Sequence, residues 1–150
     1  MRQLKIEKAL TNRDSKSIKG YLNDISSISM ISPEQEVELA IKIQGGDENS
    51  LNLLVKSNLR FVVSVAKQYQ NIGLDFEDLI SEGNLGLIKA AKNFDHTKGF
   101  KFISYAVWWI RAYITKAIEK KGKIIRLPVH HHQKANQIKR LQSKYLAKNG

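Results

Sequence analysis

FKFISYAVWWIR, residues 100–111, is the most informative segment of this chain. It holds both tryptophans of the protein, side by side, between Lys101 and Arg111. Flat aromatic rings beside cations can stack on unpaired bases while the cations hold phosphates. The same rings at helical spacing could also fill a hydrophobic core, so the geometry of the segment has to separate a binding surface from a core element.

Helical geometry favours a binding surface. A helix advances about 100° per residue, and Ser104 is a suitable N-cap for one. Such a helix has an apolar face broad enough to seat it on a core, formed by Ala106, Val107, Ile110, Tyr113, Ile114, Ala117 and Ile118. The opposite side carries Tyr105, Trp108, Trp109, Arg111, Ala112 and Thr115. Because the core face is complete without the tryptophans, we predict that Trp108 and Trp109 are exposed for binding.

Length and composition exclude several classes of protein. A chain of 150 residues predicts one domain that buries roughly 68–70% of its unfolded surface. The absence of cysteine excludes disulfides and thiolate metal sites and fits a reducing cytoplasm, where we expect the protein. No apolar run approaches the roughly 18 residues of a membrane span, and residues 1–17 lack the apolar core of a signal peptide.

Charge is spread unevenly along the chain. Residues 1–95 carry 12 Lys/Arg and 13 Asp/Glu, whereas residues 96–150 carry 13 Lys/Arg and only Glu119. The net charge of +11 therefore arises in the second part, which begins with the aromatic segment. A basic half predicts a polyanionic partner. Interleaved aromatics favour nucleic acid over a membrane surface, which a long amphipathic helix with a clean apolar face would bind.

The hydrophobic pattern is helical from end to end and predicts an all-α fold. Ser32 and Gln35 form a capping-box signal at the start of one helix. Asp47 and Asp75 are N-cap candidates for two more, and Gly122 ends the aromatic helix. We expect a compact helical bundle with four parts: an extension (1–14), a helical region (15–46), a central domain (47–122) and the start of a following linker or helical domain (123–150).

A second local feature is acidic: DFEDLISEGN, residues 75–84. Asp78, Glu82 and the exposed side of Asn84 are expected to cluster in the first half of a helix, where acidic groups suit the helix dipole. Paired carboxylates could also serve acid–base chemistry or bind a metal. Since the neighbouring sequence offers no nucleophile, histidine partner or glycine-rich phosphate loop, we predict that the protein is not an enzyme.

The run His130, His131 and His132 invites a zinc interpretation. Adjacent residues of a helix point about 100° apart and cannot readily share one metal, whereas structural zinc sites space their ligands as in HxxxH or CxxC. We therefore expect no metal and no cofactor, and a solvated or phosphate-facing run.

KGFKFISY, residues 98–105, offers an alternative because it matches most of the RNP1 strand of the RNA recognition motif. That fold needs a four-stranded sheet, and the helical patterns on both sides argue against it. A generic single-stranded RNA or DNA binder nevertheless remains open at this point. So does a purely protein-binding module.

Four motifs together resemble the central domain of bacterial primary RNA polymerase sigma factors: NLRFVVSVAKQY (58–69), DLISEGNLGLIKAAKNFD (78–95), KGFKFISYAVWWIRAYITKAI (98–118) and IRLPVH (125–130). The segment SIKGYLNDISSISMISPEQEVELAIKI, residues 17–43, resembles the helical region that precedes this domain in the same family. The resemblance covers about residues 15–135. It implies a protein that binds core RNA polymerase and recognises and melts the promoter minus-ten element.

The resemblance also implies roles for individual residues. Asp78, Glu82 and Asn84 match the surface that docks on the clamp helices of the largest polymerase subunit. Trp108 and Trp109 would wedge against the last paired step at the upstream edge of the minus-ten element. The flipped adenine of the non-template strand would stack on Tyr105, in a pocket that resembles Phe94, Asp95, Lys98, Phe100 and Ser104.

The remaining matches extend along the same strand. Asn58 and Phe61 match positions near the pocket for the last, flipped thymine, and Thr115 matches a position that reads the first, still-paired base. Phosphate contacts and further DNA contacts are implied for Lys101, Arg111, Arg126 and His130.

Three positions depart from the common family pattern. Ala112 stands where glutamine often reads the first base, Ile103 where a small hydroxyl residue is common, and Gln133 where an acidic residue often helps to read the extended element. We therefore expect a promoter preference that differs from the commonest one. The sequence also stops before the regions that read the minus-thirty-five element, so we expect the N-terminal and central portion of a longer protein.

Overall fold

The computed structural model describes residues 16–122, 134, 137–138 and 141–147. Within these residues the chain is helical and contains no β-strand, which confirms the predicted all-α class. The elements are α1 (Lys16–Ser26), α2 (Pro33–Gln44), α3 (Glu48–Ala66), the 3₁₀ turn η1 (Lys67–Tyr69), α4 (Phe76–Asn93), the 3₁₀ turn η2 (His96–Lys98) and α5 (Phe102–Lys121). No helix in the described part is long and apolar enough to cross a membrane.

Local capping explains where the first helices begin. The Ser32 side chain accepts a hydrogen bond from the Gln35 amide, and the Gln35 side chain accepts one from the Ser32 amide, which confirms the capping box of α2. Asp47 caps α3 by accepting from the Asn49 and Ser50 amides. Asp75 holds the N-cap position of α4 as predicted, but its side chain makes no capping hydrogen bond.

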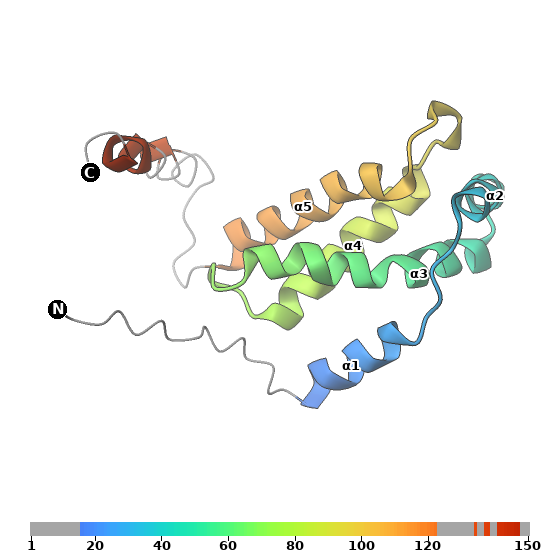
Figure 1. The fold of residues 1–150 in the computed structure, drawn as a ribbon, viewed down its shortest axis with the longest axis horizontal. Coiled ribbons are helices and arrows are strands. Elements are labelled where there is room, and N and C mark those ends of the chain that lie inside the picture. Colours follow the sequence, from blue (N-terminus) through green and yellow to red (C-terminus); the bar gives the residue numbers. More distant parts are fainter. Residues whose placement is uncertain (1–15, 123–133, 135–136, 139–140, 148–150) are drawn as a thin grey trace.

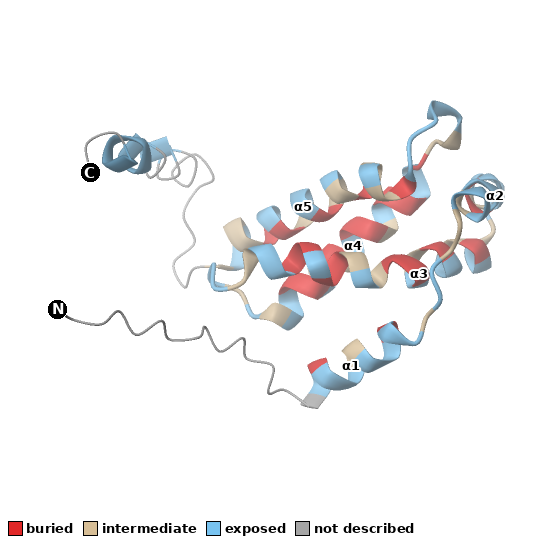
Figure 2. Ribbon diagram, viewed as in Figure 1, coloured by how far each residue is buried: buried red, intermediate tan, exposed pale blue. Residues whose placement is uncertain are grey.

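The core is formed where α3, α4 and α5 lie along one another, while α1 packs on α3 and α2 crosses one end (Figure 1). Buried residues line the inner sides of these three helices (Figure 2). The largest fully buried side chains are Phe102, Leu54, Leu79, Leu87, Ile110, Ile114 and Val62. A β-carbon at Gly86 would lie 2.8 Å from the Trp109 carbonyl oxygen, so glycine allows the close approach of α4 and α5.

The loop between α4 and α5 projects beyond the bundle beside α2, and η2 contacts α2 (Figure 1). Gly99 ends η2 in the left-handed region (φ 71°), which favours glycine.

The prediction that Ser104 is the N-cap of the aromatic helix is wrong: Lys101 holds that position and α5 begins at Phe102. Phe102, at this earlier start, is fully buried in the core. The end of α5 at Lys121, followed by Gly122, agrees with the prediction.

Several predictions fall outside the described residues: those for Arg126, His130, His131, His132 and Gln133, and that of an extension over residues 1–14. The domain boundaries therefore stay predictions.

The RNA-recognition-motif alternative is not supported, because residues 98–105 run from a 3₁₀ turn into α5 rather than along a strand. Within the described residues there is also no cluster of three or more metal-ligating side chains.

Candidate functional site

One exposed stripe runs along the N-terminal two thirds of α5. Each member lies three or four residues from another member, so they share one side of the helix. We call this set the α5 stripe: Lys101, Ser104, Trp108, Arg111, Ala112 and Thr115, all exposed. Trp108 is 70% exposed, a large value for an indole ring. The α5 stripe therefore combines a free aromatic surface with two cations, which is a suitable surface for a nucleic-acid strand.

Tyr105 and Trp109 lie at the edge of this stripe. Both are partly buried against the core, so the prediction that both tryptophans are exposed holds for Trp108 and not for Trp109. Trp109 packs against Tyr105 with ring centroids 6.4 Å apart and an interplanar angle of 68°. The ring centroid of Tyr105 in turn lies 6.0 Å from that of Phe94. These contacts fix both side chains before any ligand arrives, which lowers the entropic cost of binding.

Phe94 and Phe102 form the buried base of this aromatic cluster. Their rings meet edge to face with centroids 5.2 Å apart, and the residues are 6% and 0% exposed. Phe94 is the C-cap of α4 and Phe102 begins α5, so the pair joins the two helices under the loop. Phe94 was expected to contact a base directly, but its side chain has almost no exposed surface. Its ring instead packs beneath the ring of Tyr105.

Asn58 is another expected DNA contact that the structure buries. It is 6% exposed, and its side-chain amide donates to the Leu54 carbonyl oxygen one turn earlier at 2.8 Å. This bond satisfies the polar group inside the core. Phe61, also on α3, is partly buried against the core. The structure therefore offers Phe61 more surface for a ligand than Asn58.

The loop before α5 presents both an exposed aromatic ring and exposed cations. Phe100 is 70% exposed, and Lys98 and Lys101 are exposed beside it. Asp95 shapes the loop by accepting hydrogen bonds from the Thr97 hydroxyl at 2.7 Å and the Thr97 amide at 3.0 Å. The hydroxyl bond is the main cause that lowers the pKa of Asp95 below its usual value. Asp95 thus stays a carboxylate at neutral pH, with the Lys98 ammonium 4.0 Å away.

Glu36 also contributes to this site, although no sequence pattern indicated it. Lys101, at the N-cap of α5, makes no side-chain capping bond. The Glu36 carboxylate, which comes from α2, instead accepts a hydrogen bond from the Phe102 amide at 3.2 Å. A carboxylate at a helix N-terminus is favoured by the helix dipole and satisfies a free amide. The two partners are 66 residues apart, so no local capping pattern could reveal the contact.

We expect Glu36→Ala to loosen the start of α5. Loss of a capping carboxylate costs about 0.5–2 kcal/mol, and hydrogen exchange at the Phe102 amide should accelerate while exchange in the middle of α5 changes little. Glu36→Gln is the matched control, because its side-chain oxygen can still accept the bond. Unchanged exchange at Phe102 in the alanine variant would show that the contact does not hold the helix.

The acidic patch lies at the other end of the α4–α5 hairpin. We define it as Asp78 and Glu82, one turn apart on α4. Lys121, in the last turn of α5, pairs with Glu82 through an Nζ to Oε1 contact of 2.8 Å. Asn84 does not join the patch as expected: its amide donates to the Tyr21 hydroxyl at 3.2 Å, so it faces α1. A spacing of two residues on a helix places Asn84 about 200° from Glu82, which explains the difference.

Comparison with known proteins agrees with this arrangement. The family described as Sigma-70 region 2 matches residues 54–124, and the family described as Sigma-70 factor, region 1.2, matches residues 17–49. The chain belongs to the sigma-70 family of RNA polymerase sigma factors.

Two curated relatives, each called RNA polymerase sigma factor SigA, come from a Bacillus species and from Clostridium acetobutylicum. Each is 47% identical to this chain over 133 residues, or 89% of the chain. The chain spans about a third of the length of these relatives, 35% in both cases.

Proposed function

We propose that this chain is the part of a primary sigma factor that binds core RNA polymerase and captures the non-template strand of the promoter minus-ten element. The observation that carries the proposal is the α5 stripe, in which Trp108 is free while Tyr105 and Trp109 are held in place beside it. Family membership and the basic second part of the chain support the same conclusion.

Each part of the aromatic surface has its own proposed role. Trp108, with Trp109 behind it, blocks the last base pair at the upstream edge of the open region. Tyr105 offers the unburied part of its ring to the flipped adenine, and Phe94 supports that ring. Phe100 and Lys98 close the loop side of the same pocket. Lys101 and Arg111 hold phosphates, and Thr115 faces the first, still-paired base.

The acidic patch is the proposed docking surface for the polymerase. Asp78 and Glu82 lie at the end of the hairpin away from the loop, so one chain can bind polymerase and DNA together. Lys121 follows Trp108 by thirteen residue steps along α5, or about 20 Å at 1.5 Å per step. Asn84 then acts within the fold, by holding α1 on α4 through Tyr21.

Magnitudes indicate that the polymerase is needed for melting. Stacking of a base on an aromatic side chain is worth about 1–3 kcal/mol, whereas each DNA step costs about 1.4 kcal/mol on average to unstack. Two captured bases therefore cannot hold open a bubble of many steps. We infer that the chain traps bases as they leave the stack, within a complex that supplies the remaining contacts.

The test measures binding of a labelled single strand with the minus-ten sequence, with and without core polymerase. We expect preference for the adenine-containing strand over a strand with cytosine at that position, clearest when polymerase is present. Tyr105→Ala should abolish this preference and Tyr105→Phe should keep it, because phenylalanine retains the ring. Circular dichroism confirms that each variant is folded.

Two outcomes would contradict the proposal. Equal affinity for both strands in the assembled complex would indicate a generic single-strand binder. Polymerase binding without any contact to the strand would indicate a module that only binds protein.

A further inference from the structure

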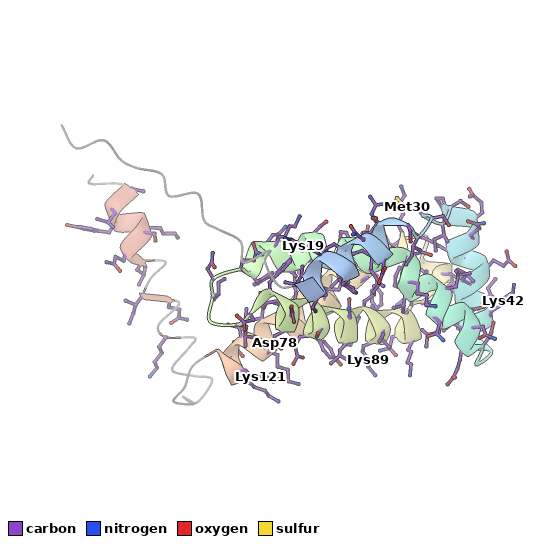
Figure 3. The ribbon with its side chains drawn as sticks, turned by 90° about the horizontal axis from the view of Figure 1, so that it is seen from below. Lys19, Met30, Lys42, Asp78, Lys89 and Lys121 are labelled. Carbon is purple, nitrogen blue, oxygen red and sulfur yellow. The ribbon has the colours of Figure 1, made fainter. Side chains whose placement is uncertain are left out.

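The ion pair between Lys121 and Glu82 joins the ends of α5 and α4. The Lys121 ammonium donates to Oε1 of Glu82 at 2.8 Å, and Figure 3 shows Lys121 near Asp78 at the same end of the hairpin. The hydrogen bond to Glu82 is the largest cause that raises the pKa of Lys121, followed by the charge of Glu82, and Asp78 adds a smaller effect. A single ammonium therefore interacts with both members of the acidic patch.

This pairing changes what the acidic patch offers to a partner. The Glu82 side chain is only 21% exposed, whereas the Lys121 side chain is 61% exposed. A cationic group that approaches Glu82 thus meets another cation already bound to the carboxylate. Like charges brought together in an interface lower affinity. The partner must displace Lys121 before it can pair with Glu82.

We propose that Lys121 is an intramolecular competitor for the polymerase-docking surface. When polymerase docks, an arginine side chain of the polymerase takes the place of Lys121 on Glu82. A guanidinium can bind both carboxylate oxygens at once, whereas Lys121 binds one. This inference rests on the proposed function of the acidic patch, and it adds the residue that sets the strength of docking.

The exchange acts on polymerase binding and not on DNA binding. Lys121 lies about 20 Å from Trp108 along the axis of α5. The screening length at physiological ionic strength is about 8 Å. When Lys121 loses its partner, solvent ions screen the electric field of its ammonium over this distance. We therefore expect no change in affinity for the single strand.

The test compares Lys121→Gln with Lys120→Gln in binding of the full 150-residue chain to core polymerase. Lys120 is the neighbouring exposed lysine, so both variants change the net charge equally. We expect Lys121→Gln to bind about two- to fivefold more tightly, the range of a surface ion pair. Lys120→Gln should change affinity less, and the difference between the two variants should shrink at high salt.

A double variant tests the mechanism. In a Glu82→Gln background, Lys121→Gln should no longer tighten binding, because the pair that it releases is already lost. Equal effects of Lys121→Gln and Lys120→Gln would overturn the competitor role. Weaker binding by Lys121→Gln would overturn it too, since Lys121 would then be a direct polymerase contact.

The same measurements separate this inference from the proposed function. If Asp78→Asn and Glu82→Gln leave polymerase affinity unchanged, the acidic patch is not the docking surface and both ideas fail. If these two variants weaken binding while Lys121→Gln behaves like Lys120→Gln, the docking surface stands and only the competitor role is wrong.

Discussion

Phe102→Ala is expected to lower the free energy of unfolding by about 3–5 kcal/mol, the usual cost of removing a buried phenylalanine side chain. Phe102 has no exposed surface and packs edge to face on Phe94. It also begins α5, and its amide bonds to Glu36. Loss of the ring therefore leaves a cavity where α2, α4 and α5 meet. A loss of this size is a large fraction of the 5–15 kcal/mol that stabilises a typical domain.

Urea unfolding followed by circular dichroism measures this loss. Phe102→Leu is the matched control, because it fills much of the space and should cost much less. Phe100→Ala is the second control: its ring is 70% exposed, and stability should change by no more than about 0.5 kcal/mol. Equal stability of the alanine variants at positions 100 and 102 would show that Phe102 does not anchor the fold.

The contrast between these two phenylalanines marks what the sequence could predict. Both lie in one basic, aromatic segment, and only the start of α5 decides which of them enters the core. At that start the Phe102 amide bonds to Glu36, which is distant in the chain and close in the fold. Caps whose partners lie within three residues, such as those at Ser32 and Asp47, were predictable because their signals are local.

In the candidate site, too, the features set by one helix were predictable and the contacts between distant residues were not. A helical projection placed Trp108 correctly because the residue faces directly away from the core. Trp109 lies at the border of the buried face, where a projection cannot tell how far Tyr105 and Phe94 cover the ring. The partners of Asn84 and Glu82 are 63 and 39 residues away. Periodicity does not report such pairs, because it describes one helix at a time.

Trp108→Ala is expected to weaken capture of promoter DNA with little loss of stability. Trp108 is 70% exposed, so its removal leaves no cavity and stability should change by no more than about 0.5 kcal/mol. The proposed contact of its indole ring with the last base pair is a stacking contact, worth about 1–3 kcal/mol. Affinity for a forked duplex with an unpaired minus-ten strand should therefore fall about 5- to 150-fold in the polymerase complex.

The measurement is a titration of the forked duplex into the complex of polymerase with each variant. Trp108→Phe keeps a flat ring and should restore part of the affinity. Leu53→Ala removes an apolar side chain of α3 that is 49% exposed and lies outside the proposed site, so it controls for general loss of exposed apolar surface. If Trp108→Ala binds the fork as well as the unsubstituted chain, the most exposed ring of α5 is not the wedge. That role would then pass to Trp109, whose packing on Tyr105 would have to open when DNA binds.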